Sequence, residues 1–180
     1  TSMEHTALKQ LLDSLIATWE NEVVEFKEAG NDYKTDKIGE YFSALANEAN
    51  LRGMEKAWLI FGVNDKTRLV TGTDYRPEPD RLQSTKMQIT EGTEPSVTFR
   101  NIYELILPEG RVVLFEVPAA PRGMPVAWKG HYYGRAAGSL TALGLDKKDE
   151  IRQQTLSDDW SAQIVANATT ADLDAAAIEK

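Results

Sequence analysis

A chain of 180 residues, 42% of them hydrophobic, has the size and composition of one ordinary domain with a buried core, and no apolar run is long enough to span a membrane. The absence of cysteine excludes disulfides and thiolate metal sites and favours a cytoplasmic location, while two histidines are too few for a histidine-based zinc site. The formal net charge of −8 argues against strong, non-specific nucleic-acid binding, because that affinity comes mainly from cations that release phosphate counterions.

Two helices and two strands are predicted in the first part of the chain. In chain order they are a helix over Thr6–Ala17, a strand over Val23–Lys27, a helix from Asp36 towards Asn47, and a strand over Ala57–Val63. Thr6 and Asp36 are suitable N-caps, and Asn47 is a candidate cap for the end of the second helix. The unbroken apolar run of the second strand is typical of a strand covered on both faces.

Two β-hairpins between two helices are predicted in the second part. In chain order the elements are a turn over Asn64–Thr67 leading into Arg68–Thr73, a helix over Asp80–Gln88, strands over Val97–Leu107 and Val112–Val117, strands over Val126–Trp128 and His131–Arg135, and a helix over Asp146–Leu156 with Asp146 as cap. Pro108-Glu-Gly-Arg111 in the first short connection and Lys129-Gly130 in the second indicate the hairpins. Because strands and helices mix without strict βαβ alternation, we expect an α+β fold with a mixed β-sheet and packed helices.

Three segments are expected along the chain. Residues 1–18 form an N-terminal helix, with residues 1–2 as a candidate cloning remnant, and residues 19–157 form the main domain. Residues 158–180, where the composition turns to Ala, Asp and Thr, are expected to lead into a further C-terminal region.

Acidic residues gather at two places in the sequence. Glu20, Glu22 and Glu25 lie in and next to the first strand, and Asp65 follows the end of the second. Buried strands that end in clustered acids are one way to assemble the oxygen ligands of a hard cation. Glu20 converges with Glu25 only if the chain bends between them, because alternate residues of a strand point to opposite faces. In the alternative interpretation Glu20 and Glu22 are solvated, and Glu25 pairs with a basic neighbour such as Lys27.

Five motifs occur in an order that resembles the Schlafen AlbA-like domain, which in bacterial proteins is regarded as DNA-binding. They are Glu20–Lys27, Ala44–Asn47, Gly62–Asp65, Val70–Gly72 and Tyr132–Ser139. The chain departs from the family after Asn47, where Glu48–Lys56 replaces a Gly-Gly turn. The resemblance implies a nucleic-acid-binding module, for DNA or RNA, of a bacterial transcriptional regulator or helicase-related protein.

The resemblance also implies an alternative, a metal-dependent endoribonuclease. Some animal Schlafen proteins cut RNA with three carboxylates and a divalent metal, and the matching positions are Glu20, Glu25 and Asp65. These carboxylates would hold Mg²⁺ or Mn²⁺ and activate water. Whether the chain is an enzyme stays open. ATP hydrolysis is not expected, because Asp65 replaces the glycine that a phosphate-binding loop needs before its lysine.

The nucleic-acid surface is predicted in the middle of the chain, since residues 51–145 carry a net charge of +2. Basic and aromatic residues that could follow a backbone and stack bases are Arg52, Lys56, Arg111, Arg122, Lys129, Tyr132 and Arg135. Alternatively, this segment is a solvated hairpin with aromatic residues in the core, and Arg135 pairs with an acid such as Glu25. A protein-interaction or ligand-sensing module is a second alternative, and a homo-oligomer stays open.

Overall fold

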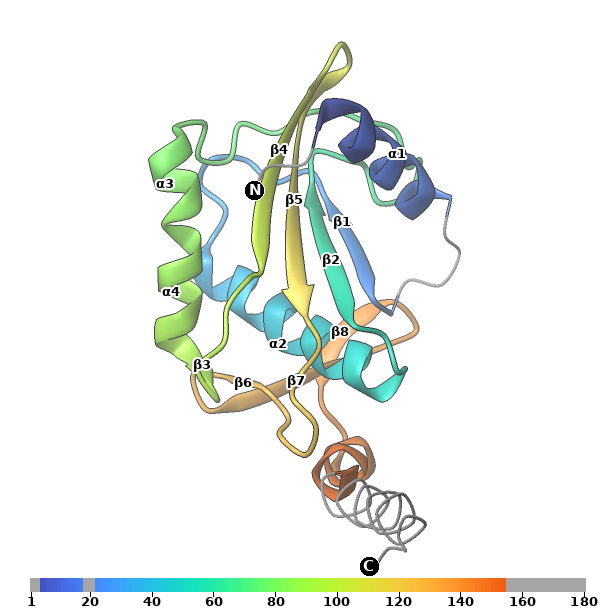
Figure 1. Cartoon of the computed structure of the whole chain (residues 1–180), viewed down its shortest axis with the longest axis vertical. Coiled ribbons are helices and arrows are strands. Elements are labelled where there is room, and N and C mark those ends of the chain that lie inside the picture. Colours follow the sequence, from blue (N-terminus) through green and yellow to red (C-terminus); the bar gives the residue numbers. More distant parts are fainter. Residues whose placement is uncertain (1–3, 18–21, 155–180) are drawn as a thin grey trace, which may run out of the picture.

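The computed structural model describes residues 4–17 and 22–154, which form the α+β fold that the sequence predicts (Figure 1). Its helices are α1 (His5–Ile16), α2 (Thr35–Leu51), α3 (Pro79–Gln83) and α4 (Thr85–Gly92), and residues 145–154 are also helical. Its strands are β1 (Val24–Lys27), β2 (Lys56–Phe61), β3 (Thr93–Glu94), β4 (Asn101–Leu107), β5 (Gly110–Pro118), β6 (Ala127–Trp128), β7 (His131–Ala136) and β8 (Ser139–Ala142). Within the described residues, no helix is long and apolar enough to cross a membrane.

The first sheet is mixed, as predicted. Its strand order is β1-β2-β5-β4, with β1 parallel to β2 and with β5 antiparallel to both of its neighbours. β2 lies inside the sheet, and each of its residues from Ala57 to Phe61 is buried, which explains the unbroken apolar run in the sequence. The register places Glu25 of β1 beside Leu59 of β2.

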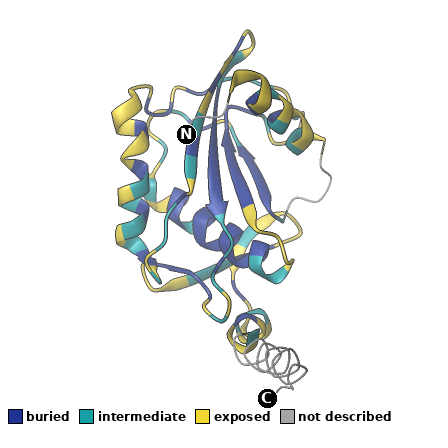
Figure 2. Ribbon diagram, in the orientation of Figure 1, coloured by how far each residue is buried: buried dark blue, intermediate teal, exposed yellow. Residues whose placement is uncertain are grey.

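Helix α2 forms the central layer of the molecule. It contacts β2 and β5 of the first sheet, and it also contacts β6, β7 and β8 of a second, antiparallel sheet of order β3-β6-β7-β8. Helix α1 covers the other face of the first sheet, where Leu8 and Leu12 are buried (Figure 1). The central strands and α2 are buried, whereas the outer surfaces of α1, α3 and α4 are exposed (Figure 2).

Polar side chains of α2 hold the second sheet in place. Asn47 Nδ2 donates to the carbonyls of Val126 (3.0 Å) and Tyr133 (2.9 Å), and its Oδ1 accepts from the Val126 N–H (2.7 Å). Ser43 Oγ donates to the Val126 carbonyl (2.7 Å) and accepts from the Tyr133 N–H (3.0 Å). One buried helix face thus satisfies backbone groups that would otherwise lose water without a partner.

The segment that departs from the family pattern, Glu48–Lys56, continues α2 for one more turn and then ends it. Gly53 adopts a φ of 70°, and its N–H donates to the Asn50 carbonyl (3.2 Å), while the Met54 N–H donates to the Ala49 carbonyl (2.9 Å). This pair of hydrogen bonds is a Schellman motif, which needs a residue that tolerates a left-handed conformation. The prediction that Asn47 caps the helix end is therefore wrong, because Asn47 lies inside α2 and bonds to the second sheet.

Other predicted boundaries differ from the structure in detail. Thr6 lies inside α1 and Asp36 in the first turn of α2, so neither is the N-cap, and Asp36 instead bonds to side chains of β6 and the turn after it. The predicted helix 80–88 is two helices that meet at Ser84. Residues 68–73 form no strand, and their one β-bridge joins Val70 to Val63. The short strands β3 and β8 were not predicted. Both pair along one edge only, so their sequences carry little apolar signal.

Candidate nucleic-acid interface

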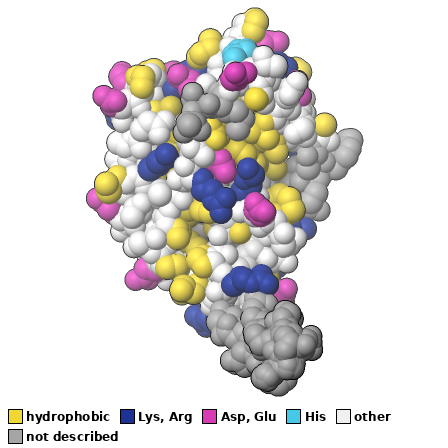
Figure 3. Space-filling view, in the orientation of Figure 1, with side chains coloured by type: hydrophobic (Ala, Val, Ile, Leu, Met, Phe, Trp, Pro, Cys, Tyr) yellow, Lys and Arg dark blue, Asp and Glu magenta, His cyan; other side chains and the backbone are white. Residues whose placement is uncertain are grey.

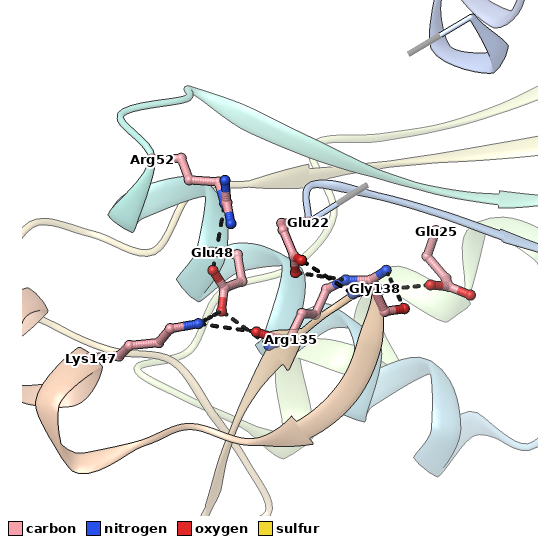
Figure 4. Close-up of polar contacts among 7 residues, drawn as sticks. All are labelled: Glu22, Glu25, Glu48, Arg52, Arg135, Gly138 and Lys147. Atoms are coloured by element: carbon pink, nitrogen blue, oxygen red, sulfur yellow. Dashed lines mark hydrogen bonds and ion pairs between the residues drawn. The ribbon is translucent and has the colours of Figure 1, made fainter. Parts of the chain in front are cut away.

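Arg135, a predicted nucleic-acid contact on β7, is buried inside the domain with 2% of its surface exposed. Its Nη1 lies 2.7 Å from Glu25 Oε1 and its Nε lies 3.8 Å from Glu22 Oε1, while Nη2 donates to the Gly138 carbonyl (3.0 Å; Figure 4). The contact with Glu25 is a close ion pair without hydrogen-bond geometry. A guanidinium enclosed in this way holds β1 against the β7–β8 hairpin and does not reach a phosphate in solvent.

Glu48, which the sequence interpretation passed over, is a second buried charge in the same cluster. It is 1% exposed, and its Oε2 accepts from the Arg135 N–H (3.0 Å) and from Lys147 Nζ (2.7 Å). Lys147 also donates to the Arg135 carbonyl (3.0 Å), and Arg52 Nε lies 3.7 Å from Glu48 Oε1 (Figure 4). Glu48 therefore ties α2 and β7 to the helix of residues 145–154.

Lys27 gives Glu25 a second cationic partner. Lys27 follows Glu25 by two positions on β1, so both side chains lie on one face of the strand, and Nζ lies 3.3 Å from Glu25 Oε2. Burial works to lower the pKa of Lys27, but its hydrogen bond with Tyr41 and the charge of Glu25 together raise that pKa above its ordinary value. Glu25 thus lies between two cations, Arg135 and Lys27, and the pairing with Lys27 is the one that the alternative sequence interpretation expects.

The proposed metal ligands are not assembled within the described residues. Glu25 is turned towards Arg135, whereas Asp65 is exposed in the turn after β2, and Glu20 lies outside the described residues. The register places Glu25 level with Leu59, six positions before Asp65. In residues 4–17 and 22–154 there is no group of three His, Cys, Asp or Glu side chains that could hold a metal ion. Because Glu20 lies outside the described residues, the three-carboxylate metal site stays a prediction.

Tyr132, three residues before Arg135, faces a different environment. Its half-buried ring lies under two cations of the helix 145–154, with Lys148 Nζ at 4.3 Å and the Arg152 guanidinium at 5.9 Å from the ring centroid. Within the described part of the chain, neither cation forms an ion pair with a carboxylate. The sequence interpretation did not select Lys148 or Arg152. Their spacing of four in a predicted helix was the available signal, since it puts both on one face.

Arg111, another predicted contact, has a structural role. Its Nε pairs with Glu104, and its two terminal nitrogens donate to the carbonyls of Thr73 (3.2 Å), Tyr75 (2.7 Å) and Arg76 (3.1 Å). These bonds fasten the loop after Gly72 to the β4–β5 hairpin. A side chain that makes this many internal hydrogen bonds has little capacity left for a phosphate.

Arg52 and Lys56 are exposed near the junction of α2 and β2, but both have acidic partners. Arg52 contacts Glu48, and Lys56 Nζ lies 3.6 Å from Glu116 Oε2 and over the Trp58 ring at 5.7 Å. Basic and acidic side chains are likewise interspersed on the face shown in Figure 3. These two cations are therefore partly neutralised.

Lys129 and Arg122, the remaining predicted contacts, lie on loops beside the second sheet. Lys129 Nζ lies 2.7 Å from Asp36 Oδ1, and this hydrogen bond, together with one from the Trp128 indole, lowers the pKa of Asp36. Arg122 is exposed beside Gly123, which lines one groove together with Tyr132 and Arg152. Of the seven predicted contacts, Tyr132 thus lies beside the additional cations, and Arg122 is the sequence neighbour of a residue that lines the same groove.

Comparison of this chain with known proteins gives its family and shows which solved structures share its fold. The model of the family described as Schlafen, AlbA_2 matches residues 20–144. The structure of the DIP2311 protein from Corynebacterium diphtheriae superimposes with a TM-score of 0.57 at 19% identity over 82% of this chain, which spans 28% of that protein. The N-terminal domain of a Nitrosomonas europaea protein related to the ATP-dependent DNA helicase RecG gives a TM-score of 0.46 at 22% identity, covering 76% of this chain and 92% of that one. No curated protein matches.

Proposed function

Because this chain belongs to the Schlafen AlbA_2 family, we propose that it is a nucleic-acid-binding module, of a cytoplasmic transcriptional regulator or helicase-related protein. The observation that carries the proposal is the pair of cations, Lys148 and Arg152, that lies over the half-buried ring of Tyr132. A positive surface with an aromatic ring is the combination that proteins use to hold a sugar–phosphate backbone and stack a base.

The helix that carries these cations is anchored to the rest of the domain. It is fastened to α2 by Lys147 on Glu48 (2.7 Å) and by Gln154 Nε2 on Asn50 Oδ1 (2.6 Å). Ile151 of the same helix is fully buried. Because the helix is anchored, binding a phosphate requires ordering of the Lys148 and Arg152 side chains but not of the backbone that carries them.

The net charge of −8 does not decide against this surface. Residues 155–180 alone hold five acidic residues and one lysine, and three acidic residues of the domain, Glu25, Glu48 and Glu116, are buried in ion pairs. Local charge within about a Debye length, roughly 8–10 Å at physiological salt, determines how strongly a bound phosphate is attracted.

Binding assays on the whole chain test the proposal. Fluorescence anisotropy with DNA and RNA oligonucleotides of about 16 nucleotides, at about 50 to 200 mM salt, should show log affinity falling linearly with log salt. The double variant Lys148→Gln/Arg152→Gln should weaken binding to every sequence and reduce the magnitude of the salt slope by about 1.4 for single strands to about 1.8 for a duplex.

A matched control removes the same charge elsewhere. Lys66 in the turn after β2 and Arg81 on α3 are exposed and lie at the end of the molecule away from the helix 145–154 (Figure 1). Lys66→Gln/Arg81→Gln should leave the salt slope unchanged. If no oligonucleotide binds at low salt, or if both double variants weaken binding equally, the proposed surface is wrong and a protein-interaction or ligand-sensing module becomes the better interpretation.

A further inference from the structure

A groove of about 330 Å³ lies beside the cations of the proposed interface. It is lined by Glu94, Pro95, Gly123, Met124, Pro125, Tyr132 and Arg152. Most of these side chains are apolar or aromatic, with one carboxylate and one guanidinium among them. The volume is at the lower end of the range for ligand sites, about 300–1,000 Å³, so the groove suits a single ring system rather than a double helix.

The strand register explains how the groove is built. Glu94 of β3 pairs with Ala127 of β6, and Ala127 pairs with Tyr132 of β7, so the three residues form one row across the sheet. Residues directly opposite in antiparallel strands point to the same face, and neighbouring strands lie about 4.8 Å apart. Glu94 and Tyr132 therefore stand about 10 Å apart on one face, on either side of Ala127, which is itself buried.

This face of the second sheet points away from α2. Trp128, which follows Ala127, packs against Gly39 of α2, where an added Cβ would come within 2.1 Å of the ring. Because alternate residues of a strand face opposite ways, Ala127 and its row face outward. The helix 145–154 reaches this outer face, where its cations contact Tyr132.

We propose that the groove takes one unpaired base of a single-stranded nucleic acid, a proposal that rests on the proposed function. The base stacks on Tyr132 and packs against Met124 and Pro95, since stacking on an aromatic ring suits every base. A base inside a duplex cannot enter, because its edge is paired and its faces are covered. Arg152 then holds an adjoining phosphate.

Glu94 gives this site a base preference. A carboxylate accepts hydrogen bonds and donates none, so it pairs with the exocyclic amine of cytosine or adenine, whereas thymine and uracil offer only carbonyl oxygens outside the ring N–H. The same negative charge repels phosphate, so the base rather than the backbone lies on the Glu94 side. We therefore expect oligo-dC and oligo-dA to bind about tenfold more tightly than oligo-dT.

The test measures binding of oligo-dC, oligo-dA, oligo-dT and a mixed-sequence duplex to the whole chain and two sets of variants. Tyr132→Ala should weaken single-strand binding about tenfold and leave duplex binding unchanged, and Tyr132→Phe should retain the wild-type affinities. Glu94→Gln should reduce the preference for dC and dA over dT, because the amide also donates a hydrogen bond.

Glu91→Gln is the matched control, since Glu91 lies on α4 and lines a different cavity. It should raise all affinities equally through loss of a negative charge, without changing the base preference. If Glu94→Gln behaves in the same way, or if duplex and single strands depend equally on Tyr132, the base site is wrong while the proposed function stands. If nothing binds at low salt, the proposed function fails and the base site fails with it.

Discussion

Tyr132 and Arg135 lie three residues apart on one strand and belong to two different parts of the molecule. Arg135 is enclosed between Glu22 and Glu25 and holds elements together, whereas Tyr132 faces outward beneath cations that have no acidic partner within the described residues. Basic and aromatic residues in one sequence segment therefore do not form one surface. The side of the strand on which each residue lies separates a structural role from a binding role.

The physical difference between the two regions is the state of their charges. A buried ion pair has already lost its water, so removing one partner leaves the other unsatisfied at a cost of several kcal/mol. An exposed cation keeps its hydration, and its removal changes stability little but changes the attraction for a phosphate. Substitutions of the buried cluster around Arg135 should therefore change mainly the free energy of unfolding. Substitutions of the surface around Tyr132 should change mainly the affinity for nucleic acid.

Arg135→Met should have the largest effect on stability. The variant leaves the buried Glu25 and the partly buried Glu22 without their shared guanidinium, so we expect the free energy of unfolding to fall by about 3–5 kcal/mol. Urea denaturation of the variant and of Lys148→Met, which removes an outward-facing cation, measures the contrast. A loss below about 1 kcal/mol for Arg135→Met would mean that the cluster does not hold the domain together.

Asn47→Leu should come next. The substitution keeps the side-chain size but leaves the Val126 N–H and the Tyr133 carbonyl without their partner, and each unsatisfied buried group costs about 1–3 kcal/mol. We expect an overall loss of about 2–4 kcal/mol in urea denaturation. Asn101→Leu, on a half-buried residue of β4, is the control and should cost less. Equal losses would show that Asn47 does not anchor the second sheet.

Glu25→Gln should destabilise the domain by about 2–3 kcal/mol, a smaller loss because Glu22 remains beside Arg135. Asp65→Asn, in an exposed turn, should change stability by less than about 0.5 kcal/mol. A catalytic metal site predicts a different pattern, in which both variants abolish Mn²⁺- or Mg²⁺-dependent RNA cleavage and both remain stable. Denaturation and a cleavage assay on the same samples distinguish the two.

Tyr132→Ala should lower the free energy of unfolding by less than about 1 kcal/mol, less than the three buried-residue variants, because its ring is only half-buried. Its effect on single-strand binding should nevertheless be about tenfold, from the lost stacking. Measuring both quantities on one preparation sharpens the comparison with Arg135. A large loss of stability with unchanged binding would place Tyr132 with the structural residues instead.

Local sequence patterns determined the elements and the fold class of this protein. The apolar run of β2 predicts a strand inside a sheet, and Gly in a short connection between two extended segments predicts each hairpin, because these signals depend on neighbouring residues alone. The ordered motifs also indicated the family, which the match to residues 20–144 confirms.

Tertiary structure decided which functional residues lie together. The segment of β7 from His131 to Ala136 has no apolar alternation, so nothing in it indicates that Arg135 turns inward and Tyr132 outward. The packing of β7 on the polar face of α2 makes that choice, since Ser43, Asn47 and Glu48 bind its backbone. The cations over Tyr132 come from a helix that begins nine positions after Ala136, so their meeting depends on contacts between distant segments rather than on any local pattern.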